Sequence, residues 1–279
     1  DACGHSVYML KSRPEASECR LCRHQFSLRS GTPLHGSHLS LRLWLVALYM
    51  IATASKGISA RQLGRWLGVP YKTAWHLNHR IRSMMLTVPH RGEPLSGEVE
   101  IDEQYGGGAQ RARNNPSATP EYVQPKSPTG RGQYRPLLLT MAQRGGAVVA
   151  QKIDSHSKHA IQEAVEQAIS PDAVVMTDGL PAYCWIGERQ PHHWVIHSKK
   201  QFARREAGRS IHVNTCESFH RLFQRTVQGV YHFVSGKHVD RYLGQSRWYW
   251  LRKKAGPISR MADLFAGAPP LPYRDLVHG

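Results

Sequence analysis

The stretch Ala173-Val-Val-Met-Thr-Asp-Gly179 places four apolar residues ahead of an acid and a glycine. A short apolar run of this kind is typical of a buried strand, and it predicts that Asp178 stands at the end of that strand. The segment Gly97-Glu-Val-Glu-Ile-Asp-Glu103 alternates polar and apolar residues. This alternation predicts a second strand, ending at Asp102. An acid at the end of a rigid strand projects into a cleft, so the two stretches indicate an α/β domain with a carboxylate site.

The surrounding sequence predicts a mixed sheet flanked by helices. Two apolar runs separated by Ala-Gln-Arg-Gly are typical of a hairpin, and apolar residues at helical spacing predict helices. The hairpin is expected over 136–141 and 146–153, a further strand over 194–197, and helices over 160–169, 215–227 and 236–254. Strands and helices in this order favour an α/β class. Residues 106–133 are rich in Gly, Pro and Arg without periodicity, which predicts a mobile basic insertion.

A group of helices is expected earlier in the chain. The first has apolar residues at helical spacing that should face a core, namely Leu41, Trp44, Leu45, Leu48, Tyr49 and Ala52. Ser59-x-x-Gln62 is a capping box that begins a short helix; Gly68 ends it, and a second helix is expected over 71–85. This arrangement is typical of a helix-turn-helix, the alternative being a helical hairpin with a solvated basic face. The second helix should expose residues suited to phosphates and base edges: Lys72, Thr73, His76, Asn78, His79, Arg80 and Arg82.

Three cysteines lie in the first 30 residues. Cys19-Arg-Leu-Cys22 has the spacing that lets two thiolates bind one tetrahedral zinc ion, and Cys3 is a candidate third ligand. The fourth is either His5 or His24, or a cysteine ahead of Asp1, which we favour because the chain does not begin with Met. The alternative is three unrelated thiols.

Composition points to a polyanionic partner. The formal net charge is +17, from 37 Lys and Arg against 20 Asp and Glu. Such an excess opposes compactness unless a polyanion shares it, and nucleic acid is the usual partner because binding releases counterions. A ribosome-associated or merely basic soluble protein is the alternative. The longest apolar stretch, 43–54, is shorter than a membrane span requires; we see no signal peptide, and an odd cysteine count of 5 fits a reducing cytoplasm.

Asp102, Asp178 and Glu217 form a candidate metal site. Converging carboxylates repel one another and ionise best with cations between them, and their oxygens suit Mg²⁺ or Mn²⁺. Two such ions about 3.5–4 Å apart would activate the attacking oxygen and stabilise the leaving oxygen of a phosphoryl displacement. Spacing alone leaves ordinary structural roles open: Asp178 before Gly179 suits a common turn, and Glu217 suits a first-turn acid favoured by the helix dipole.

Ordered blocks of the sequence carry a family resemblance. They include Gly57-Ile-Ser-Ala-Arg-Gln-Leu-Gly-Arg-Trp, Gly97-Glu-Val-Glu-Ile-Asp-Glu, Thr177-Asp-Gly-Leu-Pro-Ala-Tyr and His212-Val-Asn-Thr-Cys-Glu-Ser-Phe. From Cys3 to about Arg252 the chain closely resembles bacterial insertion-sequence transposases of the IS fifteen-ninety-five family. The resemblance implies a zinc ribbon, a helix-turn-helix and an RNase H-like catalytic domain, with the metal-binding acids at Asp102, Asp178 and Glu217. It also implies metal-dependent hydrolysis at the element's ends, then attack of the freed 3′-hydroxyl on target DNA.

The chain departs from that family pattern at two positions. Where the family has Lys seven residues after the glutamate, this chain has Gln224, followed by Arg225. Where the family has Trp after the aromatic residue at Phe219, this chain has His220. A cation there would position DNA phosphate, so either Arg225 substitutes for it or activity is reduced.

Several further polar residues carry weaker expectations. A basic run before the last acid is expected to follow backbone phosphate or, alternatively, to be a solvated loop: Lys199, Lys200, Arg204 and Arg205. Glu103, next to Asp102, could support the metal site, but we expect it to be a solvated acid. His212 and Asn214 are candidates to orient Glu217 or contact DNA, and Asn214 equally suits a helix cap.

The sequence therefore predicts a zinc ribbon over 1–35, a helix-turn-helix domain over 36–88, a catalytic domain over 97–255 and a tail over 256–279. The leading hypothesis is a cytoplasmic, nucleoid-associated DNA transposase that binds double-stranded DNA as a homo-oligomer, with Mg²⁺ or Mn²⁺ and a structural Zn²⁺. Alternatives are a non-catalytic DNA-binding regulator, a hydrolytic nuclease on the same fold, and a degenerate inactive copy.

Overall fold

The computed structural model describes residues 4–27, 29–87, 93–107, 136–265 and 271–278. The chain divides into two compact units. The first comprises Asp1–Thr53, Ala60–Val88 and Gly256–Gly279, and the second Ala54–Ser59 and Pro89–Ala255. Most of the basic insertion expected over 106–133 lies outside the described residues. Within the described parts of the chain, no helix has the length and apolar character needed to cross a membrane.

The first unit begins with a small antiparallel sheet, two of whose strands have no clear local signal in the sequence. They are β1 (Val7–Leu10), β2 (Arg13–Cys19) and β3 (Gln25–Ser27), in the order β1-β2-β3. Polar residues dominate β2 and β3. These two strands therefore lack the apolar alternation on which strand prediction depends.

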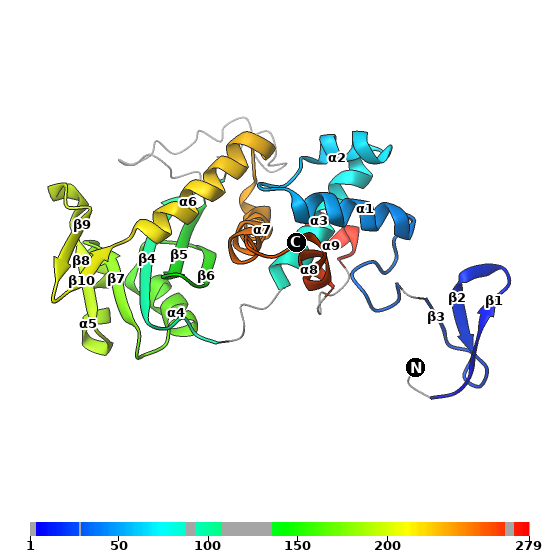
Figure 1. The fold of residues 1–279 in the computed structure, drawn as a ribbon, viewed down its shortest axis with the longest axis horizontal. Helices are drawn as coiled ribbons and strands as arrows, with labels where there is room; N and C mark the ends of the chain where they lie inside the picture. Colours follow the sequence, from blue (N-terminus) through cyan, green and yellow to red (C-terminus); the bar gives the residue numbers. More distant parts are fainter. Residues whose placement is uncertain (1–3, 28, 88–92, 108–135, 266–270, 279) are drawn as a thin grey trace, which may run out of the picture. The chain divides into compact units, whose positions relative to one another are not determined.

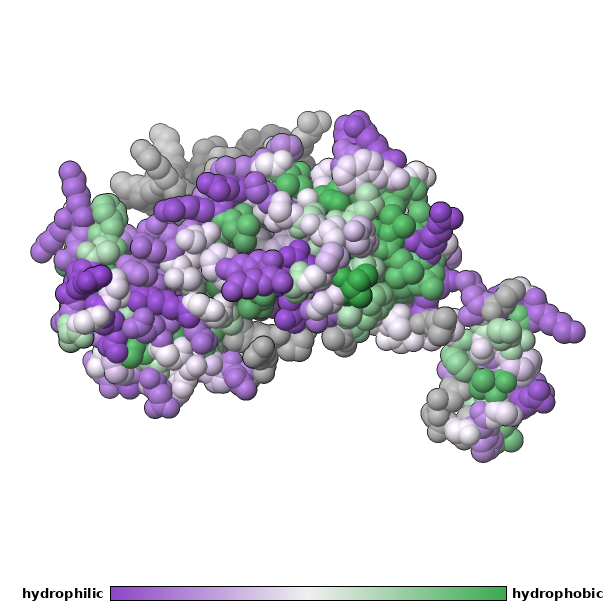
Figure 2. Space-filling view, in the orientation of Figure 1, coloured by the Kyte–Doolittle hydropathy of each residue, from purple (hydrophilic) through white to green (hydrophobic). Residues whose placement is uncertain are grey.

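Helices α1 (Leu41–Thr53), α2 (Ala60–Leu67) and α3 (Tyr71–Thr87) follow at the predicted positions. On α1 the buried stripe includes Trp44 and Leu48, as expected. The predicted burial of Leu41, Leu45 and Tyr49 was wrong, because these three side chains stay exposed along a neighbouring stripe of the same helix. Figure 2 shows apolar surface in the region of α1.

The described residues of the tail expected over 256–279 are largely helical. They contain helices α8 (Pro257–Leu264) and α9 (Tyr273–His278), and α8 packs against α1 and α3. Arg260 donates a hydrogen bond to the backbone oxygen of Ala52 at 3.1 Å. The end of the chain therefore belongs with the first helices of the chain, which its sequence alone did not reveal.

The second unit is built on a mixed five-stranded sheet in the order β6-β5-β4-β7-β8. The strands are β4 (Glu98–Tyr105), β5 (Leu137–Gln143), β6 (Val148–Ile153), β7 (Val174–Asp178) and β8 (His192–Val195). Strand β4 pairs antiparallel with β5 and parallel with β7, and β7 pairs parallel with β8. The predicted hairpin is confirmed, as is a strand leading to Asp178, and β4 includes the stretch expected before Asp102. The strand expected over 194–197 was misplaced, because β8 ends at Val195 and His197 begins a short helical segment.

Helices cover both faces of this sheet (Figure 1). On one face, α4 (Lys158–Ala168) buries Ile161 and Val165 against the side chains of β4, β5 and β7. On the other, α6 (Asn214–Thr226) and α7 (Val239–Leu251) pack Phe219, Phe223 and other apolar residues against β5 and β6. Short helical segments complete the unit: η2 (Pro181–Tyr183), α5 (Ile186–Arg189), η3 (His197–Lys199), η4 (Val227–Tyr231) and η5 (Gly236–His238).

A second hairpin, β9 (Ala203–Glu206) and β10 (Arg209–His212), leads into α6. From the sequence this segment was expected to be a basic run that follows backbone phosphate or, alternatively, a solvated loop, and no strands were predicted in it. Both strands consist mainly of polar and charged residues, so they lack the apolar alternation that would reveal them.

Candidate active site

Asp102 and Asp178 lie at matching levels of neighbouring parallel strands. Glu100 of β4 is opposite Met176 of β7, and each acid follows two residues later, so both side chains point to the same face of the sheet. Asp178 ends β7, as predicted. The prediction that Asp102 ends its strand was wrong: β4 continues to Tyr105 because it keeps β5 as an antiparallel partner beyond the end of β7.

Glu217 approaches the same face from α6. It lies in the first turn of this helix, which packs against β4 and β5. Arg221, one turn further along, pairs with Glu217 at 2.8 Å between Nη2 and Oε2. The sequence suggested Arg225 as the nearby cation. The structure places Arg221 on the glutamate instead and leaves Arg225 exposed.

The electrostatics of Asp102 show that the predicted acids influence one another. Burial, followed by the negative charges of Glu103 and Asp178 and then of Glu217, raises the pKa of Asp102 to about 8. A carboxyl group with such neighbours resists ionisation unless a cation offsets their charge. The oxygen donors fit a hard divalent ion, although no three Asp, Glu, His or Cys side chains among the described residues are arranged around a common ion position.

Glu103 also belongs to this acidic group, so the expectation of a solvated side chain was wrong. It points to the opposite face of β4 from Asp102 and accepts a hydrogen bond from the buried Tyr183 hydroxyl. Burial raises the pKa of Glu103 to about 7; the Tyr183 hydrogen bond opposes this rise, and the charge of Asp178 adds to it. Tyr183 follows Asp178 in the Thr-Asp-Gly-Leu-Pro-Ala-Tyr block, so the same segment supplies both groups.

His220 lies between Asp102 and β5. Its Nε2 is 2.9 Å from the Thr140 hydroxyl, and its Nδ1 is 3.5 Å from an Asp102 oxygen. Burial lowers the pKa of His220 to about 4, so the ring is neutral near pH 7. His220 therefore fills the position of the family's aromatic residue without bringing a positive charge to the acids.

Gln224 continues the helix face that carries Glu217. Its amide donates to the Gln104 side chain on β4 at 2.9 Å. Where the family pattern has a cation, this chain thus has a neutral contact between helix and sheet.

The expected role of Asn214 as a helix cap was wrong. Asn214 is the first residue of α6, and the preceding Val213 makes no side-chain capping bond. Instead, the buried Glu100 carboxylate accepts hydrogen bonds from the amides of Thr215 and Cys216. Sequence reasoning missed Glu100 because its position in an alternating strand resembles that of an ordinary exposed residue.

The candidate DNA contacts differ in accessibility. On α3, Lys72 is exposed and Thr73 and His76 are partly buried, whereas the predicted exposure of Asn78, His79, Arg80 and Arg82 was wrong. The Arg80 guanidinium donates to the backbone oxygens of Pro33 and His35 and lies over the Trp44 ring. We therefore reassign Arg80 from DNA contact to internal packing.

The terminal helix touches the exposed side of α3. Lys72 Nζ is 4.9 Å from the centre of the Tyr273 ring, and His76 Nε2 is 3.2 Å from the Leu271 oxygen. In the second unit, Lys199 and Lys200 are exposed around η3, as a phosphate-binding role requires.

The cysteine pair lies at one turn. Cys19 ends β2 and is buried, while Cys22 is exposed. The Cys19 amide donates to the His24 oxygen, and the Arg23 amide donates to the Cys19 oxygen. These two backbone bonds close the turn that contains both cysteines. Cys3, the third candidate ligand, lies outside the described residues.

Comparison with known proteins identifies the class. The sequence model of the ISXO2-like transposase domain matches residues 94–250. An uncharacterized protein in transposable element ISH50 of Halobacterium salinarum is 31% identical over 247 residues, which cover 85% of this chain and 77% of the relative. The chain belongs to the ISXO2-like transposase family.

Solved structures of lower similarity include a pre-cleavage Mos1 transpososome, which is 13% identical and covers 76% of this chain and 75% of its own, with a TM-score of 0.30. A Mos1 transposase paired-end complex with the left transposon end is 12% identical and covers 83% and 80%, with a TM-score of 0.31.

Proposed function

We propose that this chain is a DDE-type DNA transposase, which binds the terminal inverted repeats of an insertion sequence and catalyses DNA cleavage and strand transfer on an RNase H-like domain. The observation that carries the proposal is the arrangement of Asp102, Asp178 and Glu217 on one face of the mixed sheet, close enough for the last two to raise the pKa of the first. Family membership supports the same assignment.

Asp102, Asp178 and Glu217 would hold Mg²⁺ or Mn²⁺, which when bound supplies the positive charge that activates the attacking oxygen and stabilises the leaving oxygen. The protein's own contribution is to fix these acids in place. Asp178 is held through its Oδ1, which accepts a hydrogen bond from the Leu180 amide at 3.0 Å. Arg221 restrains the Glu217 carboxylate, and the neutral His220 restrains Asp102.

DNA binding is assigned to both units. In the first, α2 and α3 would act as a helix-turn-helix, with Lys72, Thr73 and His76 facing the duplex. In the second, Lys199, Lys200 and Arg225 would contact phosphates. The net charge of +17 supports a polyanionic partner.

Cys3, Cys19 and Cys22 would hold a structural Zn²⁺ in a ribbon formed by the first three strands, and a reducing cytoplasm would keep these thiols available. Because transposition joins two ends, we expect a homo-oligomer on DNA.

The decisive experiment compares wild-type protein with Asp178→Asn on DNA that carries the element's terminal repeats, in the presence of Mg²⁺ or Mn²⁺. We expect cleavage and joining by the wild type, loss of both in the variant, and unchanged DNA binding. Asp172→Asn is the matched control, because Asp172 is exposed and lies just before β7. Equal activity of wild type and Asp178→Asn would contradict the enzymatic assignment.

An inactive, DNA-binding copy is the second candidate. The neutral pair formed by Gln224 and Gln104, where the family pattern has a cation, favours it. Wild-type protein that binds the terminal repeats but neither cuts nor joins them would establish this alternative. Restoration of activity by Gln224→Lys would identify the missing cation as the cause.

A further inference from the structure

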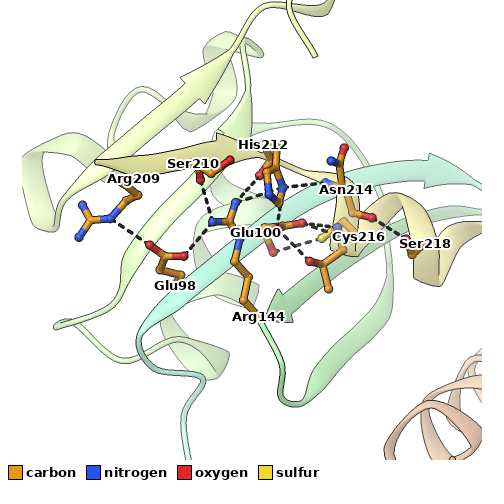
Figure 3. Close-up of polar contacts among 10 residues, drawn as sticks. Glu98, Glu100, Arg144, Arg209, Ser210, His212, Asn214, Cys216 and Ser218 are labelled. Atoms are coloured by element: carbon orange, nitrogen blue, oxygen red, sulfur yellow. Dashed lines mark hydrogen bonds and ion pairs between the residues drawn. The ribbon is translucent and has the colours of Figure 1, made fainter. Parts of the chain in front are cut away.

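Glu100 is a buried carboxylate that lies outside the predicted acid triad. Its side chain is 0% exposed, and a charged group in such a place is costly unless it is paired and hydrogen-bonded. Figure 3 shows it at the centre of a polar cluster that joins β4, the β5–β6 turn and the start of α6. The cluster contains a second glutamate, Glu98, which is partly exposed and points to its edge.

The Glu100 carboxylate binds the first turn of α6. Its Oε2 accepts hydrogen bonds from the Thr215 amide at 2.5 Å and the Cys216 amide at 3.3 Å, and its Oε1 accepts one from the Thr215 hydroxyl at 2.9 Å. The first amides of a helix have no partner within the helix, and a negative charge there is favourable. A helix is usually capped by a residue next to its own first turn. Here Glu100 caps α6 from a strand of the sheet.

Arg144 holds this carboxylate in place. Its Nε donates to Glu100 at 2.7 Å, and its Nη atoms bind Glu98 at 2.7 Å and the backbone oxygen of His212 at 3.2 Å. Arg144 thus connects the β5–β6 turn to the segment that leads into α6. The partly buried Arg144 and the buried Glu100 together fix both sides of the junction between the sheet and the helix.

The positions of the bonded residues link this junction to the acids. Glu100 precedes Asp102 by two residues on β4, so the two side chains lie on the same face. Cys216, whose amide binds Glu100, directly precedes Glu217. The Cys216 thiol also donates to the backbone oxygen of Glu100 at 3.2 Å. Bonds between Glu100 and Cys216 therefore connect the strand that carries Asp102 to the helix that carries Glu217.

We propose that Glu100, held by Arg144, is a positioning residue for the acid site: it sets the first turn of α6 so that Glu217 stands with Asp102 and Asp178 around a divalent ion. This inference rests on the proposed function, because it assumes that the three acids bind metal. Residues that orient metal ligands typically change metal affinity or activity by about 10–100-fold when they are replaced.

The test measures Mn²⁺ binding to full-length, DNA-free protein by paramagnetic resonance, with Glu100→Gln as the main variant. The amide group of glutamine keeps the shape but places a donor against either Arg144 or the helix amides. Glu98→Gln is the matched control, since Glu98 shares Arg144 as a partner and has no hydrogen bond to α6 among those of the described residues. We expect the Mn²⁺ dissociation constant to rise about 10–100-fold in Glu100→Gln and less than about fivefold in Glu98→Gln.

Amide hydrogen exchange supplies a second readout. Exchange at Thr215 and Cys216 should quicken by about tenfold or more in Glu100→Gln, with little change in the control. If that variant does not fold, Thr215→Val removes only the hydroxyl bond to Glu100 and should still weaken Mn²⁺ binding severalfold.

Equal Mn²⁺ affinity of folded Glu100→Gln and Glu98→Gln would overturn the positioning role while leaving the proposed function intact. Should Glu100→Gln not fold, unchanged Mn²⁺ affinity in Thr215→Val would have the same meaning. Wild-type protein that binds no Mn²⁺ would overturn the proposed function together with this inference.

Discussion

Replacing Asp102 by asparagine should stabilise the metal-free protein, and the gain should grow with pH. The pKa of Asp102 in the folded protein is about 8, against an ordinary value of 3.8. The folded state therefore holds a proton that the unfolded state loses around pH 3.8, and the stability of the wild type falls as pH rises from about 4 to 8. The side chain introduced by Asp102→Asn carries no charge at any pH, so the variant escapes this loss.

The magnitude follows from the distance between the two pKa values. Each pH unit above 3.8 costs about 1.4 kcal/mol until the folded group itself ionises. The expected advantage of Asp102→Asn is thus about 4 kcal/mol at pH 7 and about 2 kcal/mol at pH 5. These values are upper limits, because relaxation and water entry reduce the penalty of a buried charge.

Native-state hydrogen exchange of the peptide that spans β4 is the suitable assay, since it reports on the unit that holds Asp102. The measurements are made in EDTA at pH 5 and pH 7, with Asp172→Asn as an exposed control that should change stability little. Mg²⁺ should stabilise the wild type and leave Asp102→Asn unaffected, because only the wild type keeps the ligand. An advantage that is absent, or equal at the two pH values, would refute the electrostatic reasoning.

Three further predictions concern internal packing and one exposed lysine. Arg80→Ala should destabilise the first unit by about 2 kcal/mol or more, because it leaves two backbone oxygens without their donor. By contrast, Lys72→Ala should leave thermal stability unchanged and lower the salt dependence of DNA binding by about one unit of slope. A loss of stability in Lys72→Ala, with none in Arg80→Ala, would contradict the assignment of Arg80 to packing and of Lys72 to DNA contact. Gly57→Ala should lower the melting temperature of the second unit, because Gly57 has φ +86° and an added Cβ would collide with Gln245 and Tyr231. An unchanged melting temperature, measured by calorimetry, would contradict both the collision and the backbone strain expected at this φ.

Most of the sheet of the second unit could be predicted from the sequence because β4, β5, β6 and β7 each have a local signal. The apolar run before Asp178 and the alternation before Asp102 both mark strands, and the hairpin over β5 and β6 is equally plain. Strand ends were less predictable. Whether β4 stops at Asp102 depends on how far its neighbour β5 extends, and that information lies elsewhere in the chain.

Burial of polar residues was the main failure. Helix α3 carries polar residues on all sides, so its periodicity does not show which face is solvated, and Arg80 was placed outside although the turn around Pro33 and His35 covers it. The same limit applies to Glu103, whose environment depends on Tyr183, 80 residues further along the chain.

Glu100 shows why the acid triad could be predicted from the sequence while its support could not. A catalytic carboxylate is constrained by chemistry, so residue type and local context reveal it even before its partners are known. A positioning carboxylate is constrained by the helix that it contacts, and here the contacting amide lies 115 residues away. In the sequence Glu-Val-Glu-Ile-Asp, Glu98 and Glu100 occupy equivalent alternating positions, yet one is partly exposed and the other is sealed beneath α6. Only the docking of that helix distinguishes them, which makes the comparison of Glu100→Gln with Glu98→Gln a test of the helix contact rather than of charge.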